Sequence, residues 1–341
     1  MKYTGKIIVL AFPDTFVKMS DELMCKLLPL LGIGTRTHIK AGHAALVLIE
    51  NETGKAQYFD FGRYITPKGK GRVRGANTDA ELEIPVKAVL KDGALDNLDE
   101  FLLWLDAHPE KTHGSGRLVA SLCESIDYEK ASAYIAQLQG QGSIPYKAFG
   151  SVGSNCARFV TETILESTEE ESIIKHLKWN KRFTPSTVGN VEKSASEKGV
   201  YEVYNGEISI YNSTALRENL TNYFDKRVPA NMHSKVEAVT VPEDAQFLDG
   251  IGSSAWFHLE IISNKKAIVR RYTDTGILDF EGVTQLPENF SVSLPYKFVY
   301  DSNCVFCTIE QDGKTFVLQL EKRESSEKKS LANSAQRVHS A

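Results

Sequence analysis

The feature that most constrains the fold is a change of pattern near the middle of this 341-residue chain. Strand-like and helical stretches alternate up to about residue 190, whereas nearly all apolar stretches after residue 199 are strand-like. The segment 181–198 between them is rich in Thr, Pro, Ser, Gly and Asn, a composition typical of linkers. At about 150 residues per domain the length fits two domains. We therefore expect an α+β domain over 1–190 and a β-rich barrel or sandwich over 199–321, with a disordered, Ser/Lys/Glu-rich tail over 322–341.

The first domain begins with six consecutive apolar residues, 7–12, which favour a buried strand. Residues 42–61 contain two apolar runs around the turn-forming segment 51–55, the pattern of a β-hairpin. The remaining elements that we expect here are helices over 20–31, 95–105, 127–138 and from 155 to 165, and a strand over 117–123. In the second domain, Asn205-Gly206 predicts a tight hairpin between residues 200–204 and 208–211.

Composition excludes several classes of protein. The formal net charge of −4 offers no basic field for nucleic acid, and no stretch approaches the ~20 apolar residues of a membrane span. Five cysteines at no framework spacing favour a reducing compartment. The start of the chain does not resemble a signal peptide, so we expect a cytoplasmic location, with secretion by a specialised system left open. No motif for a cofactor stands out, and we expect none.

The five cysteines differ in their sequence context. Cys25 and Cys123 lie in apolar runs and are expected in the core. Cys304 and Cys307 form a single CxxC pair, whose sulfurs would point to opposite faces of a strand and which lacks the partners of a zinc site. We therefore expect no metal site. Cys156 alone follows turn and cap residues and precedes a helical pattern.

That position suits a nucleophile. A cysteine in the first turn of a helix meets the positive end of the helix dipole and unpaired backbone N–H groups, which favour the thiolate. The same N–H groups can stabilise an oxyanion on an attacked carbonyl group. Cys156 is therefore the candidate nucleophile.

A cysteine nucleophile needs a base and, behind it, an orienting acceptor. His43, at the start of the first hairpin strand, is the best candidate base; His38 is a rival, and His113 is expected in a solvent-facing loop. A turn near residue 52 places His43 opposite residue 62, so Asp60 is its diagonal neighbour and the candidate acceptor. Gln57 or Tyr58 would take this place in another register.

Two short motifs resemble a known family. Gly42-His43-Ala44-Ala45-Leu46 precedes Asn155-Cys156-Ala157-Arg158-Phe159-Val160-Thr161 in the chain. This order and these residues resemble the circularly permuted branch of the NlpC-like papain-fold superfamily, which includes lecithin:retinol acyltransferase-like and YiiX-like proteins. The resemblance covers about residues 1–190. It implies an antiparallel sheet packed on a cysteine-bearing helix, with Cys156 as nucleophile, His43 as base and Asp60 as the third residue. The acyltransferase branch often has a histidine at that third position, and this chain has none near Asp60.

We therefore expect a cysteine hydrolase that cleaves an amide or peptide bond through an acyl-enzyme, first of all in a cell-wall-type or γ-linked peptide, with a peptide or acyl compound as substrate. The alternatives are an acyltransferase or thioesterase, and a catalytically inactive binding module. Arg63, Asn155 and Tyr58 are expected to contact the substrate. The basic segment 66–75 either receives an anion or is a solvated loop. The partner of the C-terminal domain cannot be identified from its residues.

Overall fold

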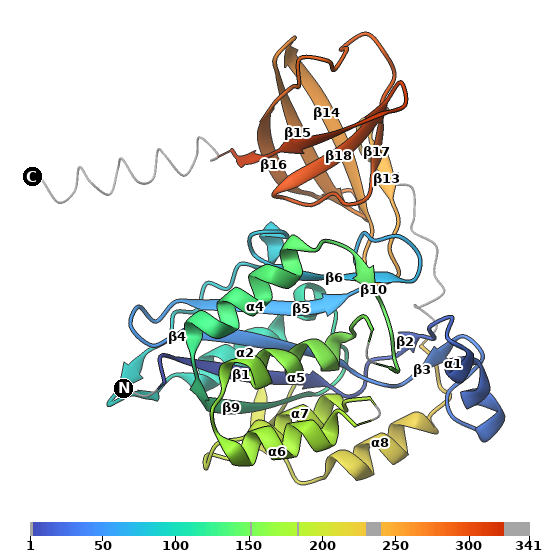
Figure 1. Ribbon diagram of the computed structural model, residues 1–341. Coiled ribbons are helices and arrows are strands. Elements are labelled where there is room, and N and C mark those ends of the chain that lie inside the picture. The colour runs from blue at the N-terminus through green and yellow to red at the C-terminus, as the bar shows by residue number, and fades with distance from the viewer. Residues whose placement is uncertain (1–2, 151, 183, 230–239, 324–341) are drawn as a thin grey trace, which may run out of the picture. The chain divides into compact units, whose positions relative to one another are not determined.

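The computed structural model describes residues 3–150, 152–182, 184–229 and 240–323. The chain divides into two compact units, of which unit 1 comprises residues 1–235 and 249–253, and unit 2 comprises 236–248 and 254–341 (Figure 1). Most of the expected tail, residues 324–341, lies outside the described part, while residue 322 belongs to a short strand. Among the described residues, no helix has the length and apolar character needed to span a bilayer.

Unit 1 is built on one eight-stranded antiparallel sheet in the order β10-β6-β5-β4-β1-β9-β11-β12. Its long central strands pair with sequence neighbours and with strands far along the chain. The strands are β1 (Gly5–Phe12), β4 (His43–Glu50), β5 (Ala56–Gly62), β6 (Lys70–Gly75), β9 (Leu118–Ile126), β10 (Ile144–Pro145), β11 (Val200–Tyr204) and β12 (Glu207–Ile210).

Helices cover both faces of this sheet (Figure 1). One face carries α4 (Tyr128–Gly140), α5 (Cys156–Ser167) and α7 (Thr187–Ser194), with α6 (Glu171–Asn180) packed beside them, and the other face carries α2 (Leu98–Ala107). The remaining elements are short: β2 (Val17–Lys18), α1 (Leu23–Leu27), η1 (Leu28–Leu31), β3 (His38–Ile39), η2 (Ala80–Leu82), β7 (Leu90–Lys91), β8 (Ala94–Leu95), α3 (Pro109–Thr112) and α8 (Ala215–Tyr223). The expected mixture of helices with a large antiparallel sheet is confirmed.

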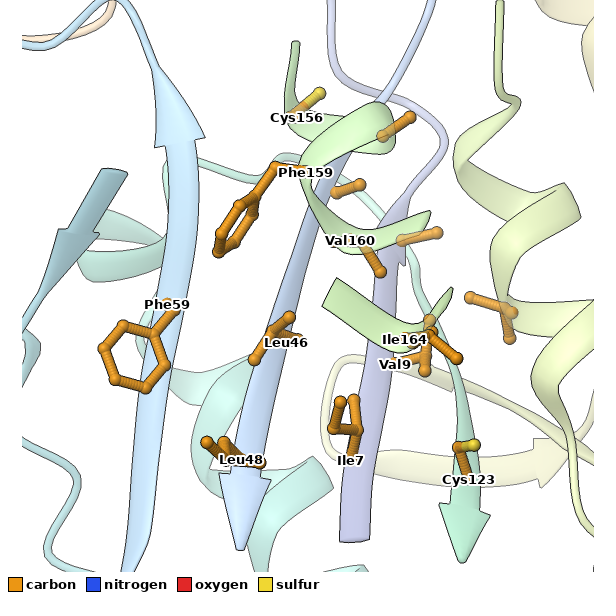
Figure 2. Packing of buried hydrophobic residues seen from close by; sticks show 14 of the residues in the cluster. Ile7, Val9, Leu46, Leu48, Phe59, Cys123, Cys156, Phe159, Val160 and Ile164 are labelled. Carbon is orange, nitrogen blue, oxygen red and sulfur yellow. The ribbon is translucent and has the colours of Figure 1, made fainter. Parts of the chain in front are cut away.

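Burial on both faces explains why residues 7–12 of β1 are all apolar rather than alternating. Ile7 and Val9 face the helices of the α5 side, while Ile8 and Leu10 face the α2 side. Figure 2 shows Phe159, Val160 and Ile164 of α5 directed at the strands, with Cys156 at the beginning of the same helix. The amphipathic face of α5 thus fixes the position of the thiol relative to the sheet.

The predicted domain boundary differs from the structure. The hairpin at Asn205-Gly206 forms as expected, with φ of 53° and 81° at these residues. However, its first strand, β11, pairs with β9 and extends the sheet of unit 1. Val203 of β11 is fully buried in the core beside α2. The polar linker-like segment 181–198 instead contains α7, which packs on β1.

Unit 2 is the smaller β-rich unit that the pattern predicts. Its two antiparallel sheets have the strand orders β13-β14-β15-β16-β20 and β17-β18-β19, and rings from both meet, with Phe257 and Phe298 5.5 Å apart between centroids. Cys307 is buried on β18, and Cys304, also buried, precedes that strand. The strands are β13 (Gln246–Leu248), β14 (Ala255–Ser263), β15 (Lys266–Thr273), β16 (Leu278–Gln285), β17 (Lys297–Val299), β18 (Phe306–Gln311), β19 (Lys314–Gln319) and β20 (Glu321–Lys322).

The placement of β11 can be tested with two truncations in one hairpin. Val203→Ala removes fully buried methyl groups and should lower the free energy of unfolding of unit 1 by roughly 2 kcal/mol. Ile210→Ala, on the exposed partner strand, should change it by less than about 0.5 kcal/mol. Urea unfolding followed by circular dichroism measures both, and equal effects would contradict the assignment of this hairpin to the core of unit 1.

Candidate active site

Cys156 is the first residue of α5 and Asn155 is its N-cap. The Asn155 side-chain oxygen accepts a hydrogen bond of 2.9 Å from the backbone N–H of Arg158, which anchors the first turn. The Cys156 side chain is mostly buried and lines a cavity. As the sequence predicts, the thiol therefore lies at the positive end of a twelve-residue amphipathic helix.

Hydrogen bonds within the loop before Cys156 hold that loop in place. The backbone N–H of Ser154 donates to Pro145 O at 3.0 Å, and the side-chain Nδ2 of Asn155 donates to Lys147 O at 2.8 Å. Gly153 adopts φ of +86°, and a Cβ there would lie 2.2 Å from Pro145 O. Only glycine permits this close approach, so the turn that presents the thiol depends on Gly153.

His43 is the first residue of β4 and pairs with the last residue of β1. On the other side of β4, Ala45 lies opposite Asp60, which makes Asp60 the diagonal neighbour of His43 as predicted. The His43 Nε2 atom lies 3.3 Å from Asp60 Oδ2. The Cys156 thiol interacts with the same imidazole and contributes to the raised pKa of His43.

Asp60 lies at the centre of a buried polar network and has no exposed surface. Arg74 donates to both carboxylate oxygens, at 3.0 and 2.6 Å, in the bidentate arrangement that suits arginine. The hydroxyls of Tyr58 and Tyr64 each donate to Oδ2 at 3.2 Å. Burial opposes the ionised form, but the charge of Arg74 and the hydrogen bond from His43 hold the pKa of Asp60 well below its usual range.

The same network acts on His43. Burial opposes the charged imidazolium, yet hydrogen bonds to Asp60 and Cys156, with the charges of those two groups, raise the pKa of His43 from 6.5 to about 9. The imidazolium therefore persists at neutral pH next to the thiol. A cationic imidazole beside a thiol is, in general, an environment that favours the thiolate.

Three residues of the network were not predicted as parts of the site. Arg74 was assigned to a basic loop, but it is a buried residue of β6, as is Arg72, which forms a bidentate pair with Asp79. The Arg74 guanidinium stacks on the ring of Tyr64, with its carbon 3.6 Å from the ring centroid. The alternation Arg72-Val73-Arg74 was the signal available, because it places two cations on one face of a strand.

His113 is the third of these residues, and its expected solvent-facing position is wrong. Its ring stacks on Tyr64 with centroids 5.3 Å apart. Burial, together with the charge of Arg74, lowers the pKa of His113 to about 3. His113 is therefore neutral at physiological pH. The rival His38 lies on β3, where its Nδ1 is 3.0 Å from Thr37 Oγ1.

The three residues expected to contact the substrate have different positions. Asn155 lines the cavity, although its side chain is engaged in capping α5 and holding the preceding loop. Arg63 is not among the lining residues: it donates to Lys18 O at 2.7 Å, and its guanidinium lies 4.4 Å from the Tyr146 ring centroid. Tyr58 is buried, and its hydroxyl donates to Asp60 Oδ2. Arg63 and Tyr58 thus both make internal contacts, and substrate contact by either residue stays a prediction.

The cavity beside Cys156 has a volume of about 280 Å³ and lies within unit 1. Over the described ranges, no cluster of three or more His, Cys, Asp or Glu side chains could hold a metal ion, in this cavity or elsewhere. Its lining residues are Val17, Lys18, Met19, Ser20, Cys25, Leu28, Ile33, Ile39, Ala41, Gly42, Tyr146, Ala148, Phe149, Asn155, Cys156, Ala157, Thr184, Pro185, Thr187 and Tyr223.

With this geometry described, the chain can be compared with known proteins. Residues 7–173 match the family described as "Type VI secretion system effector TseH-like". This segment contains Cys156, His43 and Asp60. Residues 245–321 match a second family, "DUF6695 C-terminal domain". The first strand of unit 2 begins at residue 246, so this match supports a domain boundary later than the predicted one.

Among solved structures, the chain is similar to the crystal structure of the type VI secretion system effector TseH. The identity is 17% and the TM-score 0.41, over 62% of this chain and 100% of that one. No curated protein matches the chain.

The dependence of Asp60 on Arg74 can be tested by substitution. Arg74→Met leaves a buried carboxylate without its bidentate partner and should lower the free energy of unfolding by about 3–5 kcal/mol. The depressed pKa of Asp60 stabilises the wild-type fold above the ordinary carboxyl value, and that effect is lost as pH falls. The difference in stability between wild type and Arg74→Met should therefore be largest near neutral pH and shrink toward pH 3. Chemical unfolding between pH 3 and 8 measures both effects. Lys68→Met, at an exposed surface pair, is the control and should change neither.

Proposed function

We propose that unit 1 is a cysteine hydrolase of the permuted papain-like (NlpC-like) type, with Cys156 as nucleophile, His43 as general base and acid, and Asp60 as the residue that orients His43. The observation that carries the proposal is the His43 imidazole, which interacts with the Cys156 thiol and whose Nε2 lies 3.3 Å from the buried Asp60 carboxylate. The order of the elements, histidine strand before cysteine helix, supports the permuted arrangement.

The reaction follows from these positions. In this mechanism the proton of the thiol resides on His43 as the imidazolium, and the Cys156 thiolate attacks the carbonyl carbon, so that a C–S bond forms and the carbonyl oxygen becomes an oxyanion. Backbone N–H groups in the first turn of α5 stabilise that oxyanion. The imidazolium of His43 then protonates the leaving amine as the C–N bond breaks. Water, deprotonated by His43, attacks the thioester and releases the acid and the thiol.

We propose an amide or peptide bond as the substrate, with a cell-wall-type or γ-linked peptide as the first choice.

The description of the family that matches residues 7–173 names a secretion system effector. It supports the specialised secretion route over a resident cytoplasmic enzyme.

Acyl transfer or thioester hydrolysis is the second candidate, and the largely apolar lining of the cavity beside Cys156 favours it. Both candidates use the same three residues and pass through the same acyl-enzyme. They differ in the acceptor and in the leaving group. The inactive binding module, the third candidate, would not need an imidazole of raised pKa beside a thiol.

Replacing the nucleophile tests the proposal directly. Cys156→Ala should abolish hydrolysis of a panel of fluorogenic peptide amides and acyl esters, and should also abolish fast alkylation by a thiol-directed electrophile at neutral pH. Cys123→Ala removes another thiol of unit 1 and is the matched control: Cys123 is buried on β9, its pKa is raised by burial to about 11, and both activities should persist. Hydrolysis that survives in Cys156→Ala would overturn the proposed function.

The role of Asp60 predicts a pH dependence. Leaving-group protonation requires the His43 imidazolium, so kcat/KM should fall as pH rises through about 9. Asp60→Asn removes the charge that supports the imidazolium. The alkaline limb should then move toward the ordinary value near 6.5, with a loss of roughly 10²-fold in kcat/KM at pH 8.

Asp79→Asn is the matched control for this experiment, because Asp79 is also buried and paired with an arginine, Arg72, on the same strand as Arg74. In Asp79→Asn the fall of kcat/KM with rising pH should still be centred near pH 9. An unshifted limb in Asp60→Asn would contradict the role assigned to Asp60.

A further inference from the structure

We infer that the cavity beside Cys156 is a binding subsite for one uncharged apolar group of about ten non-hydrogen atoms, carried by the substrate next to the scissile carbonyl. The inference rests on the proposed function and goes beyond it, because it names the chemical class that the site accepts. It is drawn from the lining residues, their charges and the volume of the cavity.

The walls of the cavity are largely apolar and come from segments far apart in the sequence. Leu28 of η1, Ile39 of β3 and Tyr223 of α8 line it. Tyr146 and Phe149, from the loop that precedes α5, add two aromatic rings. An apolar group that fills this cavity removes its own apolar surface and that of the cavity wall from water, which favours binding.

Charges are scarce along these walls. Of the lining residues, all of which the structure describes, none is an aspartate, glutamate or arginine, and Lys18 is the one lysine. Lys18 is exposed, and its carbonyl oxygen accepts the hydrogen bond from Arg63. A charged substrate group would therefore lose hydration against these walls, with Lys18 as the one charged lining residue able to pair with an anion, which is unfavourable.

The reactive groups lie at this same cavity. Cys156, Asn155 and Ala157, at the start of α5, belong to its lining, and so does Gly42, the residue before His43. A group bound in the cavity is thus attached close to the carbon that Cys156 attacks.

The volume sets the size of the group. At roughly 30 Å³ per water-sized group, about 280 Å³ holds some nine or ten non-hydrogen atoms. An octanoyl chain or one aromatic side chain fills this space.

Alkylation of Cys156 in the full-length chain tests the inference without requiring turnover. The probes are N-octyl-iodoacetamide and N-(7-carboxyheptyl)-iodoacetamide, which share the chain length and differ in a terminal carboxylate. The octyl probe should modify Cys156 at least tenfold faster. Cys25 lines the same cavity, but burial raises the pKa of its thiol, and mass spectrometry of tryptic peptides separates the two adducts. Equal rates at Cys156 would overturn the inference.

Two leucines of η1 supply a matched pair of variants. Leu28→Asp places a carboxylate at the cavity wall and should reduce the rate ratio of the two probes at least fivefold. Leu30→Asp introduces the same charge two residues away, where the side chain is 81% exposed and outside the lining, and should leave the ratio unchanged. A ratio that falls equally in both variants would contradict a role for the cavity. Thermal unfolding by circular dichroism verifies that each variant is folded.

Hydrolysis then separates the two sources of an apolar group. The substrates are the 4-nitroanilides of octanoate, N-acetyl-phenylalanine and N-acetyl-glutamate. Faster cleavage of the octanoyl compound identifies an acyl chain, and faster cleavage of the phenylalanyl compound identifies a side chain. Preference for the glutamyl compound overturns the inference. If the wild-type chain prefers the octyl probe but Cys156→Ala still hydrolyses these compounds, the proposed function is overturned and the inference about the cavity is not.

Discussion

The Asp60 carboxylate is enclosed by the protein, and four side chains share its charge. A buried ion of this kind is stable only where charged and hydrogen-bonding partners replace the lost water. Arg74 supplies the opposite charge, and His43, Tyr58 and Tyr64 supply further donors. The position of His43 follows from this requirement, because its Nε2 is one of the donors that the carboxylate holds. The candidate active site is therefore built outward from Asp60.

The network also ties together three neighbouring strands. His43 begins β4, Asp60 lies in β5 and Arg74 lies in β6, so the antiparallel register of these strands determines whether the three side chains meet. Cys156 comes from the other structural layer, at the start of a helix that packs on this sheet (Figure 2). The thiol and the imidazole are thus held by separate elements whose contact depends on the packing of α5.

Tyr64 depends on a segment far along the chain. The loop after β5 is bonded by residues 249–253, through Ile65 N–H to Ser253 O and Gly252 N–H to Arg63 O, both at 2.9 Å. A Cβ on Gly250 would lie 2.2 Å from Ser253 O and 2.5 Å from Ile65 N, so glycine is needed there. The close approach that Gly250 permits thus holds the loop that carries Tyr64.

Much of the site follows from local patterns in the sequence. The turn residues at 51–55 set the hairpin register, and that register makes Asp60 the diagonal neighbour of His43. Asn155 before an amphipathic stretch places Cys156 at a helix start. Arg74, Tyr64 and His113 were not identified in this way. The alternation around Arg74 places two cations on one face of a strand, but the local sequence does not tell whether that face is buried. Whether such a side chain is buried depends on its contacts with residues elsewhere in the chain.

The sequence by itself thus determined the two fold classes, the helix that carries Cys156 and the hairpin that joins His43 to Asp60, since these depend on hydrophobic periodicity, turns and caps. The tertiary structure decided which charges are buried, where unit 1 ends and what lines the cavity beside the thiol. Each of these depends on contacts between residues far apart in the chain: β11 completes the sheet only because β9 leaves an edge for it, and the cavity exists only where η1, β3, α8 and the start of α5 meet. Local sequence patterns do not predict such long-range contacts.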